Sequence, residues 1–159
     1  MKIRINLSRQ TLELFDDSGK CLRNYAVSTS KMEPGEQRGS FRTPRGRHIV
    51  RARIGEGQPE NAVFVRRRPT GEIYSRELAD RHPGRDWILT RILWLSGCEP
   101  GRNRLGDVDT MRRFVYIHGT PDGTELGQPN SIGCIRMRNA DILELFDLVP
   151  ARAVVEITE

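Results

Sequence analysis

The chain has 159 residues, a net charge of +5 and a pI near 9.6, and its basic side chains are 23 Arg and 3 Lys. This length suits one domain with a real core, so we expect a single domain over residues 1–159. The charge favours anionic partners, although scattered arginines usually form a solvated surface. Aromatic residues make up only 6% and no nucleic-acid-binding signature is present, so a nucleic-acid partner is not expected.

The N-terminus alternates polar and apolar residues over 1–7 and lacks the apolar run of a signal peptide. No stretch is long and apolar enough for a transmembrane helix. These features predict a cytoplasmic chain with no membrane span. A monomer is expected.

Apolar residues recur at every second position in several short segments, which is typical of half-buried strands. A near-continuous apolar run over 87–95 favours the buried centre of the sheet. Residues 29–44 form a long connection that ends in the turn Thr43-Pro44-Arg45-Gly46, and connections of this length tend to be functional or mobile. Shorter strands are predicted over residues 3–7, 12–14, 21–28, 48–54, 62–65, 113–117 and 153–157.

One clear helix is predicted in the C-terminal half of the chain. Asn139 is a candidate N-cap, Asp141 lies in the first turn, and apolar residues follow helical spacing up to Val149. Pro150 ends the helix, and residues 75–80 favour a further helical turn. The fold class is therefore mainly β with one clear helix.

The three cysteines show no C-x-x-C spacing, so neither a disulfide framework nor a zinc site is indicated, and no metal or cofactor is expected. Cys21 shares a strand face with Tyr25 and Val27 and is interpreted as a packing residue. Cys98 has no histidine at a comparable register. Cys134 is thus the candidate nucleophile.

His118 and Cys134 form the candidate catalytic pair, because a thiol that is mostly protonated at neutral pH needs an imidazole to take its proton. His118 is expected at the C-terminal end of the strand over 113–117, facing a cleft, with the following loop returning Cys134 to its side. Gly133 permits a tight backbone, and the amides of Gly133 and Cys134 can stabilise an oxyanion. His48 is interpreted as structural or exposed.

These residues resemble a known family. His118-Gly119, followed by Ser131-Ile132-Gly133-Cys134-Ile135-Arg136-Met137, is similar to the signature of the L,D-transpeptidase (YkuD-like) catalytic domain, a histidine followed by Ser-His-Gly-Cys. Ile132 stands where the family has a second histidine, so a polar contact near the thiol is missing. The Thr43-Pro44-x-Gly46 turn and the N-terminal hairpin extend the resemblance over nearly the whole chain.

The resemblance implies a β-sandwich-like catalytic fold and a reaction on peptidoglycan stem peptides. Cys134 would attack the carbonyl at the L-centre of diaminopimelate in a tetrapeptide, D-Ala would leave, and an acceptor amine would resolve the thioester. The carbonyl of Gly119 would orient the imidazole and Arg136 would pair with a substrate carboxylate. Ser131 and Ile132 would lie at the substrate, although a serine that only holds the turn is an equal interpretation of Ser131.

Three alternatives stay open. Water as the acceptor gives an L,D-carboxypeptidase at the same site, and a catalytically degenerate relative is a second possibility. A basic, non-catalytic module that binds an anionic wall polymer or nucleic acid is a third. The resemblance also implies an exported enzyme of the periplasm or cell wall, in contrast to the cytoplasmic prediction from the N-terminus.

Overall fold

The computed structural model describes all 159 residues and is mainly β, with one main helix, as predicted. The strands are β1 (Lys2–Asn6), β2 (Thr11–Phe15), β3 (Cys21–Ser28), β4 (Gly46–Ile54), β5 (Ala62–Val65), β6 (Arg68–Ile73), β7 (Leu89–Gly97), β8 (Tyr116–Thr120), β9 (Ile135–Arg138) and β10 (Val154–Thr158). The helices are α1 (Arg76–Arg81), the short 3-10 turn Gly106–Val108 and α2 (Asn139–Leu148). Neither α-helix is long and apolar enough to cross a membrane.

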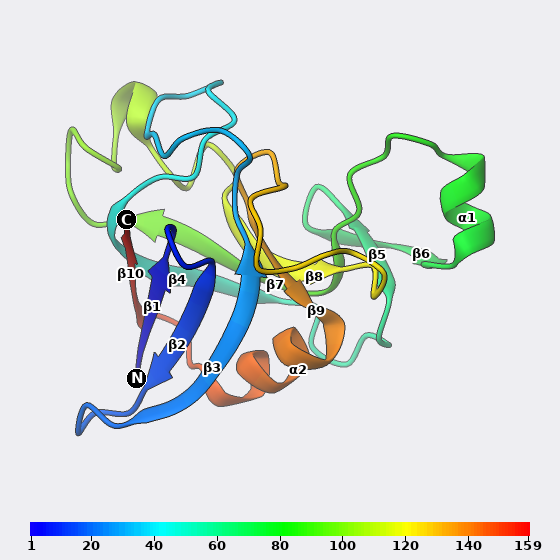
Figure 1. Cartoon of the computed structure of the whole chain (residues 1–159), viewed down its shortest axis with the longest axis horizontal. Helices are drawn as coiled ribbons and strands as arrows, with labels where there is room; N and C mark the ends of the chain where they lie inside the picture. Colours follow the sequence, from blue (N-terminus) through cyan, green and yellow to red (C-terminus); the bar gives the residue numbers. More distant parts are fainter.

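Eight of the strands close on themselves. Their order is β4-β10-β1-β2-β3-β9-β8-β7, and β7 pairs back onto β4. In Figure 1, β1, β2, β3 and β10 form one layer, β4, β7, β8 and β9 form the other, and α2 lies along one end. The β5–β6 hairpin and α1 project from the side of β7 (Figure 1). The result is the two-layered fold expected from the sequence.

The main core lies inside this ring because period-2 strands put alternate side chains on its inner face. Ile3 and Leu12 from one layer are fully buried against Ile117 and Ile135 from the other. Each such side chain contributes about 1.5–3 kcal/mol through the area it removes from water. The apolar face of α2 completes the core with Ile142, Leu145 and Phe146.

The outer face of β8 and β9 carries the candidate catalytic residues. Since Ile117 and Ile135 point inward and pair with each other, the alternate residues of both strands point outward. His118 pairs with Arg136, and Cys134 lies two residues before Arg136 on the same side. A second apolar cluster that includes Phe64 and Tyr116 packs against Cys134 there. The ring therefore places His118 and Cys134 on neighbouring strands outside the main core.

The position of His118 in its strand corrects the prediction from sequence. The strand was expected over 113–117, whereas β8 begins at Tyr116, because the chain before it makes a turn in which Phe114 has a left-handed φ of 56°. His118 is therefore the third residue of β8 and is fully buried, and it does not lie at the open end of a strand.

Two further side chains differ from prediction. Cys21 is exposed and does not pack, because the pairing of β2 with β3 shifts between Leu14 and Phe15 and carries Cys21 out of the buried alternation. Asn139 is the first residue of α2 and not its cap, since the N-cap position falls on Arg138. Asn139 is fully buried. Its side chain is used in hydrogen bonds to Thr90, Asn61 and Asp122.

Strand boundaries follow the apolar pattern closely but not completely. The run over 87–95 is β7 at Leu89–Gly97, which pairs with β4, β5 and β8 and so occupies the centre of its layer. β6 was not predicted, because its sequence Arg-Pro-Thr-Gly-Glu-Ile has no apolar alternation. It is held by pairing with β5 alone.

Candidate active site

A cleft of about 640 Å³ opens beside the thiol of Cys134. Its walls come from the long connection between β3 and β4, the β5–β6 turn, the segment before β7 and the turn before β8. The residues that line it are Arg38, Gly39, Phe41, Arg66, Arg67, Asp86, Ile88, Arg112, Arg113, Phe114, Val115, Tyr116, Ile132, Gly133 and Cys134. His118 is not among them and lies buried behind this lining.

The imidazole of His118 has a defined tautomer. Its Nδ1 lies 2.6 Å from the carbonyl oxygen of Gly119, and a carbonyl only accepts, so Nδ1 carries the proton. The opposite nitrogen, Nε2, is buried, has no hydrogen-bond partner and presents a lone pair. Burial lowers the pKa of His118, so the ring is neutral at physiological pH. This is the protonation state that a general base requires.

The thiol of Cys134 is hydrogen-bonded at rest to the backbone at the start of β8 and just before it. The amide of Tyr116 donates to Sγ at 3.4 Å, and the thiol donates to the carbonyl oxygen of Phe114 at 3.5 Å. Burial raises the pKa of Cys134 to about 12, and the nearby Arg136 and Arg113 oppose that rise. The residue is therefore a thiol and not a thiolate. Its proton must leave Phe114 before it can reach Nε2 of His118.

The turn that presents Cys134 is held by its own serine. Ser131 Oγ donates to the carbonyl of Cys134 at 2.6 Å and accepts from the amide of Gly133 at 3.2 Å. Ser131 is 1% exposed, so its hydroxyl serves the turn. Since the Gly133 amide is already used, the Cys134 amide is the one left to face an oxyanion, and the expected pair of donors is reduced to one. Gly133 has a φ of 130°, a backbone conformation that would be strained in a residue with a side chain.

Thr43, from the Thr-Pro-x-Gly turn, reaches the same loop. Its hydroxyl donates to the carbonyl of Gly133 at 2.9 Å and accepts from the amide of Ser30 at 3.0 Å, and both contacts are buried. The Gly133 carbonyl and the Cys134 N–H belong to one planar peptide group. Thr43 therefore fixes the direction in which the Cys134 N–H points.

Arg136 already holds a carboxylate from the protein itself. Its guanidinium contacts Asp86 at 2.8 Å and the carbonyl of Asn130 at 2.9 Å. Because Arg136 pairs across the strands with His118, the charges of Arg136 and Asp86 act on both the imidazole and the thiol. A substrate carboxylate at Arg136 would have to displace Asp86.

Ile132 and Gly119 are placed by different constraints. Ile132 is 46% exposed and lines the cleft, so its side chain does not pack the loop against the core. Gly119 is buried, and a Cβ there would contact the side-chain oxygen of Asn139 and come within 2.6 Å of the carbonyl of Leu89. Only glycine fits at the residue whose carbonyl orients His118.

Several residues of the site were not identified from the sequence. Tyr116 supplies the amide bonded to the thiol, and its hydroxyl accepts from Arg67 at 2.9 Å. The guanidinium of Arg67 also stacks on Phe114, at 4.7 Å from the ring centroid. The Arg66-Arg67-Arg68 run was the available signal for Arg67. Asp86 had no signal, since its pairing spans fifty positions of the chain.

The other candidate groups lie outside this cleft. Cys98 is half-buried and does not line it. His48 is fully buried, with Nδ1 3.0 Å from the carbonyl of Gly46 and Nε2 3.0 Å from Thr110 Oγ1, and burial lowers its pKa to about 4. No group of three or more His, Cys, Asp or Glu side chains is arranged to hold a metal ion.

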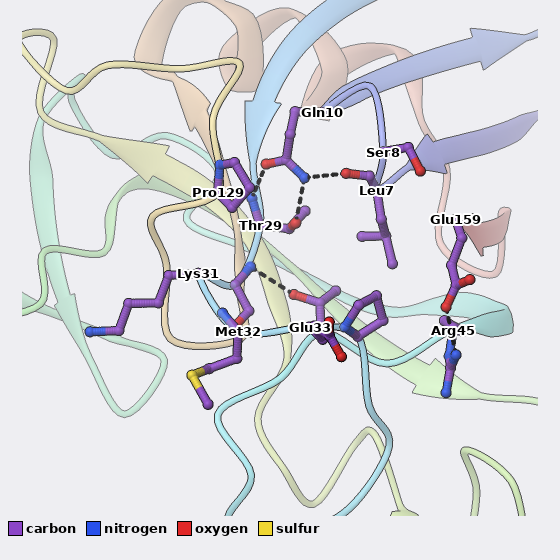
Figure 2. Close-up of a pocket in the computed structure, with 13 residues that line it drawn as sticks. Leu7, Ser8, Gln10, Thr29, Lys31, Met32, Glu33, Arg45, Pro129 and Glu159 are labelled. Carbon is purple, nitrogen blue, oxygen red and sulfur yellow. Dashed lines mark hydrogen bonds and ion pairs between the residues drawn. The ribbon is translucent and has the colours of Figure 1, made fainter.

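A second hollow, of about 530 Å³, lies beside the 29–34 segment and contains no thiol or imidazole. Figure 2 shows Gln10 at its wall, where the side-chain amide donates to Leu7 and Thr29. Arg45 pairs with Glu159 at 2.6 Å along the same hollow (Figure 2). These polar groups bond to one another, so the hollow is read as part of the scaffold.

The Cys134 thiol, just before β9, and the neutral His118 imidazole of β8 lie beside one cleft of a closed, mainly β fold. The family model of the YkuD L,D-transpeptidase catalytic domain matches residues 1–157, and the chain belongs to this family. Two putative L,D-transpeptidases YkuD are similar in sequence. The protein of Bacillus subtilis is 34% identical over 82 residues, 52% of this chain and 40% of that protein. That of Bacillus licheniformis is 50% identical over 47 residues, 30% of this chain and 28% of that protein.

Solved structures share the fold. An L,D-transpeptidase from Mycobacterium smegmatis superposes with a TM-score of 0.56 at 17% identity, covering 99% of this chain and 58% of that one. L,D-transpeptidase 3 from Mycobacterium tuberculosis, in complex with a faropenem-derived adduct, gives a TM-score of 0.59 at 16% identity, covering 99% of this chain and 59% of that one. The chain thus spans less than half of the two curated relatives and about 60% of these solved chains.

Proposed function

We propose that this chain is a cysteine-dependent L,D-transpeptidase acting on peptidoglycan stem peptides. The observation that carries the proposal is the tautomer of His118, because donation from Nδ1 to the Gly119 carbonyl leaves Nε2 unprotonated and without a competing partner. Cys134 lies immediately before the neighbouring strand β9 and lines the cleft. Membership of the family supports the substrate class.

The reaction proceeds in two half-steps. Cys134 Sγ attacks the carbonyl at the L-centre of the third stem residue while His118 Nε2 takes the thiol proton, and the oxygen receives a hydrogen bond from the Cys134 amide. The C–N bond to D-Ala breaks, and the imidazolium protonates the leaving amine. An acceptor amine then attacks the thioester carbonyl and gives a proton to Nε2. The C–S bond breaks, and the sulfur takes the proton back from Nε2 to restore the thiol.

The neutral resting pair determines how the first step begins. With the thiol pKa raised to about 12 and the imidazole pKa lowered, the pair rests as a neutral thiol and a neutral imidazole, so His118 must take the thiol proton in the first step. General-base assistance of this kind contributes about 10² to 10⁴ in rate. His118 is therefore needed for attack itself and not only for binding.

Intact mass spectrometry after incubation with a carbapenem tests the nucleophile. We expect one adduct, located on the peptide that contains Cys134, and none in Cys134→Ala, while Cys21→Ala and Cys98→Ala are still labelled. A tetrapeptide donor with an added amine acceptor then distinguishes the crosslinked product from the hydrolysed tripeptide. Labelling that persists in Cys134→Ala would refute the assignment.

A further inference from the structure

The cleft at Cys134 is strongly cationic. Five of the residues that line it are arginines and one is a carboxylate, Asp86, which is already paired with Arg136. The 159-residue chain carries a net charge of only +5, so this positive charge is concentrated and not an average of the surface. A cleft of one sign raises the local concentration of ligands of the other sign.

Two of the five arginines are used by the protein itself. Arg67 donates to the hydroxyl of Tyr116 and stacks on Phe114. Arg113 donates to the carbonyl of Arg42 at 2.6 Å and so holds the long connection between β3 and β4 against the site. Their contacts build the walls of the cleft.

The other three arginines are free to bind a ligand. Arg38, Arg66 and Arg112 are exposed, and their guanidinium groups take part in none of the ion pairs of the chain. They come from three segments that are far apart in sequence, the long connection, the β5–β6 turn and the turn before β8. Anionic groups at several points of one ligand can therefore be bound around the thiol.

Part of the backbone around the cleft is strained. Four of the nine non-glycine residues with positive φ line this cleft, namely Phe41 at 58°, Arg66 at 50°, Arg67 at 66° and Phe114 at 56°. Such conformations persist where surrounding contacts enforce them, and they gather at functional sites. Phe41 and Phe114 are also 61% and 49% exposed, and so offer apolar surface beside the charges.

We propose that this cleft selects acyl donors that carry several free carboxylates, and that Arg38, Arg66 and Arg112 are the residues that distinguish a carboxylate from a carboxamide. The inference rests on the proposed transpeptidase function and names its substrate class: stem peptides with unmodified carboxyl groups. A carboxylate accepts charge-assisted hydrogen bonds from a guanidinium, whereas a carboxamide has no charge and also brings donors that a guanidinium cannot accept. The aliphatic parts of the peptide contact Phe41 and Phe114.

Binding and acylation are measured with two synthetic tetrapeptides that differ only in having side carboxylates or carboxamides. Cys134→Ala, which cannot react, is titrated calorimetrically with each peptide. We expect the free-carboxylate peptide to bind about 2- to 5-fold more tightly for each arginine engaged, and the preference to shrink at high salt. Arg66→Gln and Arg112→Gln, made in that background, should each reduce the preference.

Arg68→Gln is the matched control, since Arg68 is exposed, begins β6 two residues after Arg66 and does not line the cleft. Equal binding of the two peptides, no binding of either, or an equal loss in Arg68→Gln and Arg66→Gln overturns the inference. Selective binding to Cys134→Ala without acylation of the wild type by either peptide overturns the proposed function and leaves the selectivity established.

Discussion

Thr43→Val removes the hydroxyl that ties the Thr-Pro-x-Gly turn to the cysteine loop while keeping the volume of the side chain. It leaves the Gly133 carbonyl and the Ser30 amide buried without their partner. Each unsatisfied buried group costs about 1–3 kcal/mol, so the free energy of unfolding should fall by about 2 to 6 kcal/mol. For a chain of 159 residues this corresponds to a Tm lower by about 4–24 °C.

The catalytic effect should be separable from the loss of stability. Without Thr43 the Gly133–Cys134 peptide group can rotate, and the Cys134 N–H no longer points at the developing oxyanion. A well-placed donor is worth about 10² to 10³ in rate, so misdirection of this amide should slow acylation by a carbapenem about 10- to 100-fold. Alkylation of the same thiol by iodoacetamide forms no oxyanion, and its rate should change little.

Thr43→Ser is the control, because it keeps the hydroxyl and loses one methyl group, at a cost of about 0.8 kcal/mol. Melting is followed by circular dichroism, and acylation and alkylation by intact mass below the melting transition. If the ratio of acylation to alkylation is the same in Thr43→Val as in the wild type, the peptide group does not depend on Thr43 and the reasoning is refuted.

Three histidine-related predictions follow from burial and exposure. His118→Gln should lower acylation about 10² to 10⁴-fold. The wild-type pH profile should show an acid limb below the ordinary histidine pKa, because burial lowers that of His118; a limb at or above it would contradict this. His48 binds a proton in the unfolded chain below pH 6.5 but in the folded chain only below about pH 4. The stability this group provides is therefore present above pH 6.5 and lost as pH falls to 4, by about 3 kcal/mol. In denaturant titrations, the free energy of unfolding should fall less between pH 6.5 and pH 4 in His48→Gln than in the wild type. Ile132→His should raise carbapenem acylation without lowering the Tm, since Ile132 is exposed; unchanged acylation at equal Tm would show that the missing imidazole is not limiting.

The main strands could be predicted because burial on one face leaves a period-2 trace in the sequence. Ile3 and Ile5 of β1, and Leu12 and Leu14 of β2, show that trace and are fully buried. β6 leaves no such trace, since it pairs only with β5 and nearly all of its residues are exposed. The start of β8 was misplaced because the apolar residues of 113–117 look like one strand, whereas Phe114 adopts a left-handed conformation that a β-forming side chain rarely takes.

The candidate residues of the site could be named from the sequence, whereas their hydrogen-bond partners could not. His118 and Cys134 could be singled out because few residue types serve as base and nucleophile. The sequence could not reveal that the Cys134 thiol donates a hydrogen bond to the carbonyl oxygen of Phe114. The partner of Arg136 could not be inferred either, because Asp86 reaches it from a loop before another strand. Such pairings are set by tertiary approach, which no local pattern records.

The pairing of β4 with both β10 and β7 also bears on self-association. Every strand of the eight-membered ring has a paired neighbour on both sides over at least part of its length. β3 pairs with β9 only at Val27 and Ser28, so its earlier residues have no strand partner on that side. β6 is the last strand of the sheet, and it carries Arg68, Pro69 and Gly71. Proline cannot donate to a new ladder, and charge and glycine disfavour one. The free edge of β6 is therefore a poor template for strand-to-strand aggregation.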